Sequence, residues 1–144
     1  MALKVELKPN ERLIIGEAVI TNSDQRTRFL IEGEAPILRE KDILTAKLAD
    51  TPAKRIYLAV QLMYTAKDPS AHHSVYFQLI GDFLRAAPSS MAFIEDINNF
   101  ILTGEMYKAL KTAKKLIAYE SELLENAKRG AGVRVSRPEN RKSP

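Results

Sequence analysis

The stretch from residue 10 to residue 43 constrains the fold more than any other part of this chain. Short apolar runs rich in β-branched residues alternate there with polar turns, a pattern typical of small antiparallel sheets. Side chains alternate along a strand, so Arg26 and Arg28 fall on one face, and Phe29 and Ile31 fall on the other. The sequence therefore predicts a small sheet with an apolar face and a face that carries guanidinium groups.

The strands of this sheet can be assigned from the alternation of apolar and polar residues. Gly16 allows a bulge or a sharp bend, and the turn-forming residues 22–25 are expected to close a hairpin. A sheet of this size needs a cover or a partner for its apolar face. Three or four strands are predicted: residues 3–8, residues 13–21 with the bulge or bend at Gly16, residues 27–32, and a short fourth strand at 37–38.

Four helices are predicted after residue 45. Thr51 is a helix-capping residue, and Pro52 suits the first helical position. The last helix has lysines in its first half and acids, including Glu120 and Glu122, in its second half. We interpret these acids as surface charges, and their order opposes the helix dipole, which hints at a partner. The apolar spacing predicts helices over about 52–67, around 75–84 and ending before Pro88, from Ser89 or Ser90 to Gly104, and over about 105–127.

The predicted fold class is α+β, in three regions. Residues 1–45 form a small antiparallel β-sheet, residues 46–128 form a bundle of about four α-helices, and residues 129–144 form a basic tail. The positive net charge comes from the C-terminal end, because residues 128–144 hold six Lys and Arg against Glu139 alone, a net charge of +5 that exceeds the +4 of the whole chain. Glycine and proline interrupt the tail, so we expect disorder there. Such an arm either attracts nucleic acid or an acidic partner, or keeps a protein soluble.

The composition excludes several classes of function. The chain has no cysteine, which rules out disulfide scaffolds, thiolate metal sites and cysteine nucleophiles. It has no run of 18 apolar residues and no leader-like start, so we expect a cytoplasmic protein with no membrane contact. The two histidines, His72 and His73, are adjacent and do not make a metal pair. With no catalytic or phosphate-binding motif, we expect no enzyme activity, no metal and no cofactor.

The arginines of the sheet allow two interpretations. Arg26, Arg28 and Arg39 either pair with acids across strands, or face nucleic acid. Arginine suits the second role because its planar fork grips a phosphate or a guanine edge with two hydrogen bonds and stacks on bases. The acids considered for the first interpretation are Glu32, Glu34 and Glu40.

Three long motifs, at residues 7–22, 31–44 and 51–57, resemble the FlbT family of bacterial flagellin-synthesis regulators. They fall in the family's order over residues 1 to about 125, and the basic tail resembles the variable part. The resemblance implies a post-transcriptional repressor that acts at the 5′ untranslated leader of flagellin mRNA and promotes decay of that message. It also implies partnership with, or opposition to, the small helical activator FlaF.

Residues 10–43 also look like the mRNA-binding CsrA family, in which an intertwined β dimer binds loops in mRNA leaders. The shared features include Glu11, the Leu-Ile-Ile-Gly run that ends at Gly16, and an Ala-Pro pair followed by Arg39 and Glu40. Asn10 and Leu38 depart from that family's pattern. This likeness implies a homodimer that binds RNA through its first strand and through the position of Arg39.

The hypothesis from the sequence is an RNA-binding repressor that reads a single-stranded or looped leader. The basic tail would strengthen binding through counterion release. A competing hypothesis is a protein-interaction module of flagellar assembly control, in which the helices bind FlaF and the effect on mRNA is indirect. The candidate RNA-binding residues are Lys4, Arg26, Arg28, Arg39 and Lys41.

Overall fold

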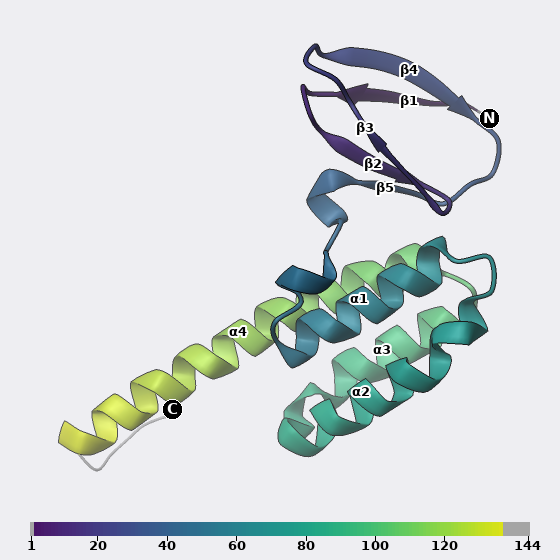
Figure 1. Cartoon of the computed structure of the whole chain (residues 1–144). Helices are drawn as coiled ribbons and strands as arrows, with labels where there is room; N and C mark the ends of the chain where they lie inside the picture. The colour runs from purple at the N-terminus through teal and green to yellow at the C-terminus, as the bar shows by residue number, and fades with distance from the viewer. Residues whose placement is uncertain (1, 137–144) are drawn as a thin grey trace.

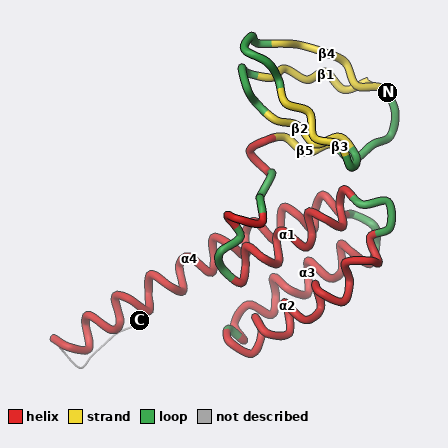
Figure 2. Tube along the Cα trace, in the orientation of Figure 1, coloured by secondary structure: helices red, strands yellow, loops and turns green. Residues whose placement is uncertain are grey.

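The computed structural model describes the backbone of residues 2–136 and the side chains of residues 2–129. Within that range, five short strands precede four α-helices, which confirms the predicted α+β class and the order of its elements (Figures 1 and 2). The strands are β1 (Ala2–Leu7), β2 (Arg12–Ile15), β3 (Ala18–Thr21), β4 (Thr27–Glu32) and β5 (Ile37–Arg39). The helices are α1 (Pro52–Thr65), α2 (His73–Ala86), α3 (Met91–Leu102) and α4 (Met106–Ser136), with short 3-10 turns η1 (Glu40–Asp42), η2 (Ala46–Leu48), η3 (Pro69–His72) and η4 (Pro88–Ser90).

The strands form two small antiparallel sheets rather than one. β1 pairs with β4, and β2 lies between β3 and β5. Figure 1 shows the β1–β4 pair lying over the three-stranded sheet. The facing sides share a buried cluster formed by Val5, Leu7 and Leu13, with Phe29 and Ile31 packed against it. Each sheet has one apolar face that must be buried, and packing the two faces together satisfies both.

The tight hairpin lies at Gly16, so the prediction of a hairpin at residues 22–25 is wrong. Gly16 has a φ of 60° and begins the two-residue turn between β2 and β3, as glycine does in a type II′ turn. Residues 22–25 instead carry the chain from β3 to β4, which lie in different sheets. The side-chain amide of Asn22 fixes this crossover by donating to the carbonyl oxygens of Leu7 at 3.2 Å and Lys8 at 2.9 Å.

The three-stranded sheet joins the β region to the helices. Leu13 faces the β1–β4 sheet, whereas Leu38 and Ile14 belong to the core that the helices form. The hydroxyl of Tyr64 on α1 donates to the carbonyl oxygen of Ile37 at 3.1 Å. This sheet is therefore covered on both faces along β2 and β5. Strand β3 is different, because it lies at the edge of the sheet and is exposed along its whole length.

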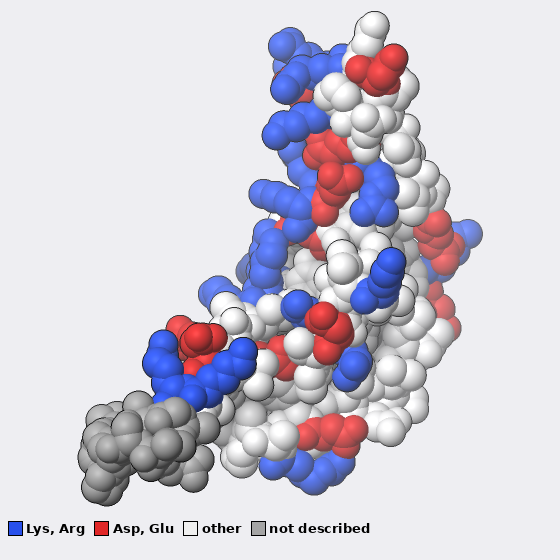
Figure 3. Space-filling view, turned by 60° about the vertical axis from the view of Figure 1, so that its left-hand side comes forward, with Lys and Arg blue, Asp and Glu red and all other residues white. Residues whose placement is uncertain are grey.

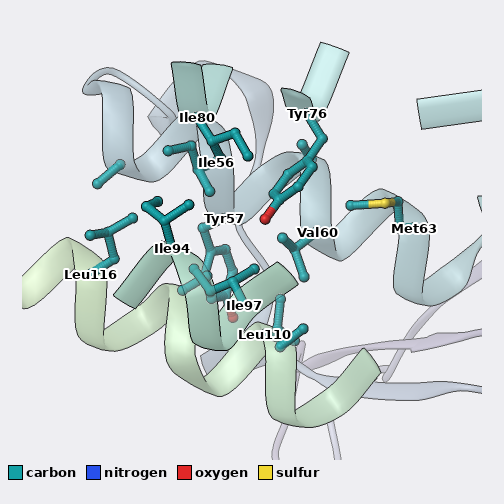
Figure 4. Close-up of a cluster of buried hydrophobic side chains, with 14 of the residues drawn as sticks. Ile56, Tyr57, Val60, Met63, Tyr76, Ile80, Ile94, Ile97, Leu110 and Leu116 are labelled. Carbon is teal, nitrogen blue, oxygen red and sulfur yellow. The ribbon is translucent and has the colours of Figure 1, made fainter. Parts of the chain in front are cut away.

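The helical core is built from apolar side chains of α1, α2, α3 and α4 (Figure 4). Ile56, Val60, Ile97 and Leu116 are fully buried there. The predicted start of α1 is confirmed, since Thr51 caps it by accepting from the backbone N–H of Lys54 at 3.2 Å and Pro52 takes the first position. Figure 1 shows α1 and α4 side by side below the sheets, with α2 and α3 on the far side from the sheets.

Two side chains of α1 hold the segment that links the sheets to the helices. Gln61 accepts from the backbone N–H of Leu44 at 2.8 Å and donates to the carbonyl oxygen of the same residue at 3.0 Å. The buried hydroxyl of Tyr57 donates to the carbonyl oxygen of Asp42 at 2.6 Å. These bonds replace the strand pairing that the linker lacks, and they fix where residues 40–44 lie on α1.

Helix α4 runs to Ser136, beyond the end predicted near Ala127. It passes through Gly130 and Gly132, because a glycine inside a helix costs only about 1 kcal/mol and does not by itself end one. The part of the predicted disordered tail at 137–144 lies outside the described residues. Across the described range, the apolar stretches of the helices are too short to span a lipid bilayer.

The sequence predicted that the acids in the second half of α4 are surface charges. The structure places one of them inside. Glu120 is 7% exposed and lies against the first turn of α1, whereas Glu122 is exposed. The prediction is therefore wrong for Glu120. Glu120 contacts another helix of the same chain, with its carboxylate 2.9 Å from the backbone N–H of Ala53.

Candidate nucleic-acid interface

The five candidate residues fall on two surfaces. Lys4 and Arg28 project from the outer face of the β1–β4 sheet, and Arg26 directly precedes β4. Arg39 ends β5, and Lys41 lies in the η1 turn that leads toward the helices. The sequence placed all five on one sheet. The fold separates them because β4 and β5 belong to different sheets.

On the outer face of the β1–β4 sheet, Arg26 and Arg28 both form ion pairs with the same acid. Glu6 lies opposite Arg28 across the strand pair. Its carboxylate accepts from Arg26 Nη1 at 2.8 Å and lies 3.8 Å from Arg28 Nε. The hydrogen bond from Arg26 is the largest cause of the lowered pKa of Glu6. The pairing acid is thus Glu6 rather than the three acids considered from the sequence.

Arg39 and Lys41 lie on a surface with more positive charge. Among the side chains that the structure describes, neither forms an ion pair with a carboxylate, and both are exposed. Glu40, between them, bonds instead to Arg12, whose backbone N–H lies 2.9 Å from its carboxylate. Arg39 and Lys41 line a hollow of about 450 Å³ at the junction of the sheets and the helices. Their charges are therefore available to a ligand.

The floor of this junction is a buried carboxylate surrounded by lysines. Asp42 is 4% exposed, and it accepts from Lys114 Nζ at 2.6 Å, with Lys111 Nζ at 3.6 Å. Burial alone would raise the pKa of Asp42, but the hydrogen bond from Lys114 and the charges of Lys114, Lys111 and Lys41 outweigh it, so the pKa is lowered. Three ammonium groups around one carboxylate leave an excess of positive charge at the surface.

The lysines of α4 are further candidates for binding RNA, and the prediction from the sequence did not include them. Lys108, Lys111 and Lys115 line a second hollow of about 490 Å³ on the side of α4. A signal for them was present, because positions three and four apart in a helix share one face. What the sequence could not indicate is that this face lies beside Arg39 and Lys41. In Figure 3, Lys and Arg side chains, with acids among them, follow one edge of the molecule from the sheets down toward the helices.

Aromatic rings lie between these two groups of cations. Tyr107, in the first turn of α4, is 44% exposed, and its ring centroid lies 6.0 Å from that of Tyr64. Lys111 Nζ is 5.1 Å from the centroid of Tyr107, and Lys108 Nζ is 5.9 Å from that of Phe100, both within the range of cation–π contacts. The contact with Tyr107 also raises the pKa of Lys111, which stays charged.

A cluster of His, Asp and Glu side chains would indicate a metal site. Within residues 2–129, no three His, Asp or Glu side chains gather closely enough to hold a metal ion. His72 ends η3 and His73 begins α2. The described residues instead form an α+β protein with a basic and aromatic surface where the sheets meet the helices.

The chain belongs to the FlbT family. A sequence model of this family, described as flagellar protein FlbT, matches residues 3–124. A relative from Bradyrhizobium diazoefficiens, named probable flagellum biosynthesis repressor protein FlbT 1, is 63% identical over 124 residues, which are 85% of each chain. A relative from Caulobacter vibrioides, named flagellum biosynthesis repressor protein FlbT, is 32% identical over 137 residues, which are 92% of this chain and 96% of the relative.

A third relative, from a Caulobacter species, is named probable flagellum biosynthesis repressor protein FlbT and is 34% identical over 127 residues, 86% of this chain and 97% of its own. No solved structure matches the chain. The predicted resemblance to FlbT is therefore confirmed. The local likeness to CsrA proteins gains no support from these matches.

Proposed function

We propose that this protein is a post-transcriptional repressor of flagellin synthesis that binds the 5′ untranslated leader of flagellin mRNA and promotes its degradation. The names of the relatives support a role as a repressor of flagellum biosynthesis. The observation that supports RNA as the ligand is the gathering of Arg39 and Lys41 beside Lys111 and Lys114, with Asp42 as the acid at their centre. A surface with surplus cations next to exposed rings suits a nucleic-acid strand.

In this proposal the cations at the junction of the sheets and the helices contribute more to RNA affinity than those on the outer face of the β1–β4 sheet. Arg39 and Lys41 contact phosphates directly, because no carboxylate within the described part of the chain pairs with them. Arg26 and Arg28 contribute less, since Glu6 already neutralises part of their charge. Lys4, on the same outer face, extends the contact. Repression follows when the bound protein covers the ribosome-loading region or leaves the message open to a nuclease.

The test is a titration of the full chain against the flagellin leader and against a scrambled RNA of equal length, at two salt concentrations. We expect tighter binding to the leader. The double variant Arg39→Ala/Lys41→Ala should lower affinity about tenfold and flatten the logarithmic salt dependence by about one to two charges. The matched control is Lys54→Ala/Arg85→Ala, because these cations line none of the hollows described above. Equal binding of the two RNAs, or none, would refute the proposal.

A second candidate function is a protein-interaction module whose partner is FlaF or another helical assembly factor. One observation favours it: Val75 and Phe77 on α2 are 58% and 54% exposed, although both are large and apolar. Exposed apolar side chains suit contact with a partner protein, and because positions two apart on a helix do not share a face, Val75 and Phe77 offer two separate contacts. Salt distinguishes the two functions, because an apolar contact responds little to salt, whereas binding to phosphates weakens steeply. In the second case Phe77→Ala abolishes partner binding and leaves RNA untouched.

A further inference from the structure

Three hollows meet at Tyr107. The first, of about 450 Å³, has Tyr64 and Arg39 in its wall, and the second, of about 570 Å³, also has Tyr64. The third, of about 490 Å³, shares Lys108 with the second. Tyr107 lines all three. We call this continuous surface the Tyr107 groove, and each of its parts has the volume typical of a site for a small ligand group.

Tyr107 is not required to fill the helical core. It is 44% exposed in the first turn of α4, while Leu110, one turn later, is buried. Its ring centroid lies 6.0 Å from that of a second tyrosine, Tyr64, and 5.1 Å from the ammonium group of Lys111. Tyr64 is held in place because its hydroxyl donates to the carbonyl oxygen of Ile37. The groove therefore presents a partly exposed aromatic surface whose supporting ring is fixed by the sheet.

Positive charge lies on both sides of this aromatic surface. Arg39 and Lys41 are at the sheet end, and Lys108 and Lys115 are at the α4 end. The residues that line the groove, together with Lys114, which pairs with Asp42, comprise six cations and three acids. The cations are Arg39, Lys41, Lys108, Lys111, Lys114 and Lys115, and the acids are Asp42, Asp96 and Glu105.

We propose that the Tyr107 groove holds an unpaired RNA base stacked on Tyr107, with the phosphates on its two sides bound by the sheet-end and α4-end cations. The inference rests on the proposed function and names the part of the RNA that is recognised. Every base has a flat face, so stacking on a tyrosine is tolerant of sequence and needs only an unpaired nucleotide. In an A-form duplex the bases are stacked on each other, and no face is free for the ring. The groove thus selects single-stranded or looped leader.

The experiment uses the full chain and one leader RNA, either single-stranded or annealed to its complement. We expect the single strand to bind about tenfold more tightly than the duplex. Tyr107→Ala and Tyr107→Leu should each lower affinity for the single strand about tenfold, while Tyr107→Phe keeps it, because Phe preserves the ring. None of these variants should change the salt dependence, since none removes a charge. Irradiation of the complex should cross-link RNA to the peptide that contains Tyr107.

The matched control is Phe77→Ala, which removes a ring from α2 that is 54% exposed, against 44% for Tyr107. Circular dichroism checks that each variant is folded, and Tyr107→Leu keeps the bulk if Tyr107→Ala does not fold. If the wild type prefers the leader but Tyr107→Leu binds as well as wild type, the groove inference is wrong and the proposed function stands. The groove inference is also wrong if Tyr107→Phe is as weak as Tyr107→Ala, or if the duplex binds as tightly as the single strand. If the wild type binds no RNA, both fall.

Discussion

Glu120 and Ala53 are 67 residues apart in the chain, yet the carboxylate of Glu120 accepts the backbone N–H of Ala53 at 2.9 Å. Ala53 lies in the first turn of α1, where backbone N–H groups have no partner within the helix. A carboxylate at that position satisfies one donor and interacts favourably with the helix dipole. The middle of α4 thereby caps the beginning of α1.

This cap predicts the stability of two neighbouring variants. Glu120→Ala should lower the free energy of unfolding by about 1–2 kcal/mol, because it leaves a buried N–H without a partner. Glu122→Ala, two residues away and exposed, should change it by less than about 0.5 kcal/mol. Urea unfolding followed by circular dichroism measures both. Equal losses would mean that the contact with Ala53 does not stabilise the fold.

Asp42→Asn should destabilise the junction between the sheets and the helices. Removing one partner of a fully buried ion pair costs about 3–5 kcal/mol. The side chains of Lys111 and Lys114 are 40% and 46% exposed, so solvent screening should reduce the loss to about 1–3 kcal/mol. Asp24→Asn makes the same chemical change at an exposed turn residue and should be close to neutral. A neutral Asp42→Asn variant would contradict the role of the lysine cluster.

The same carboxylate predicts a pH dependence. Folding lowers the pKa of Asp42, so its contribution to stability is present above the unfolded pKa of about 3.9 and is lost as pH falls through the folded pKa. The stability difference between wild type and Asp42→Asn should therefore be constant near neutral pH and shrink below about pH 4. Urea unfolding of both proteins over a pH series tests the sign. A difference that grows in acid would refute it.

Gln61 should behave as a structural residue although glutamine is usually found on surfaces. Gln61→Ala removes both hydrogen bonds to Leu44 and should lower the free energy of unfolding by about 1–3 kcal/mol. Gln78→Ala, on the exposed side of α2, is the control and should have little effect. Hydrogen exchange at the amide of Leu44 gives a local measurement, and we expect it to accelerate in Gln61→Ala.

The outer face of the β1–β4 sheet offers a test of its own. Glu6→Gln removes the acid that holds Arg26 and Arg28. If these arginines contribute to RNA binding as proposed, the affinity should rise about two- to threefold and its salt dependence should steepen. Glu32→Gln, on the same face near the end of β4, controls for the change in net charge. Identical effects of the two variants would show that only net charge matters.

The sequence predicts the elements of this fold better than their arrangement. Alternation and helical spacing depend on neighbours in the chain, so the four helices and every β-rich run were expected, although the prediction made β2 and β3 one strand bent at Gly16. Which strands pair depends on contacts between distant residues, and the polar residues 22–25 suit a crossover as well as a hairpin. Arg39 and Lys41 were predicted as RNA-binding residues from the sequence alone. Tyr107 was not, because its place in the site depends on contacts between distant parts of the chain. Its exposure follows only from where α4 meets β5.

The residues of the Tyr107 groove are translated at different times. Arg39 and Lys41 leave the ribosome early, but Tyr107 and the α4 lysines come more than sixty positions later, and α1 lacks its carboxylate cap until Glu120 has emerged. The sheets can assemble while translation continues, whereas the groove is assembled from both ends of the chain. A product cut short before α4 would carry the arginines of the sheets and no groove. Only a chain translated through the lysines of α4 can form the groove.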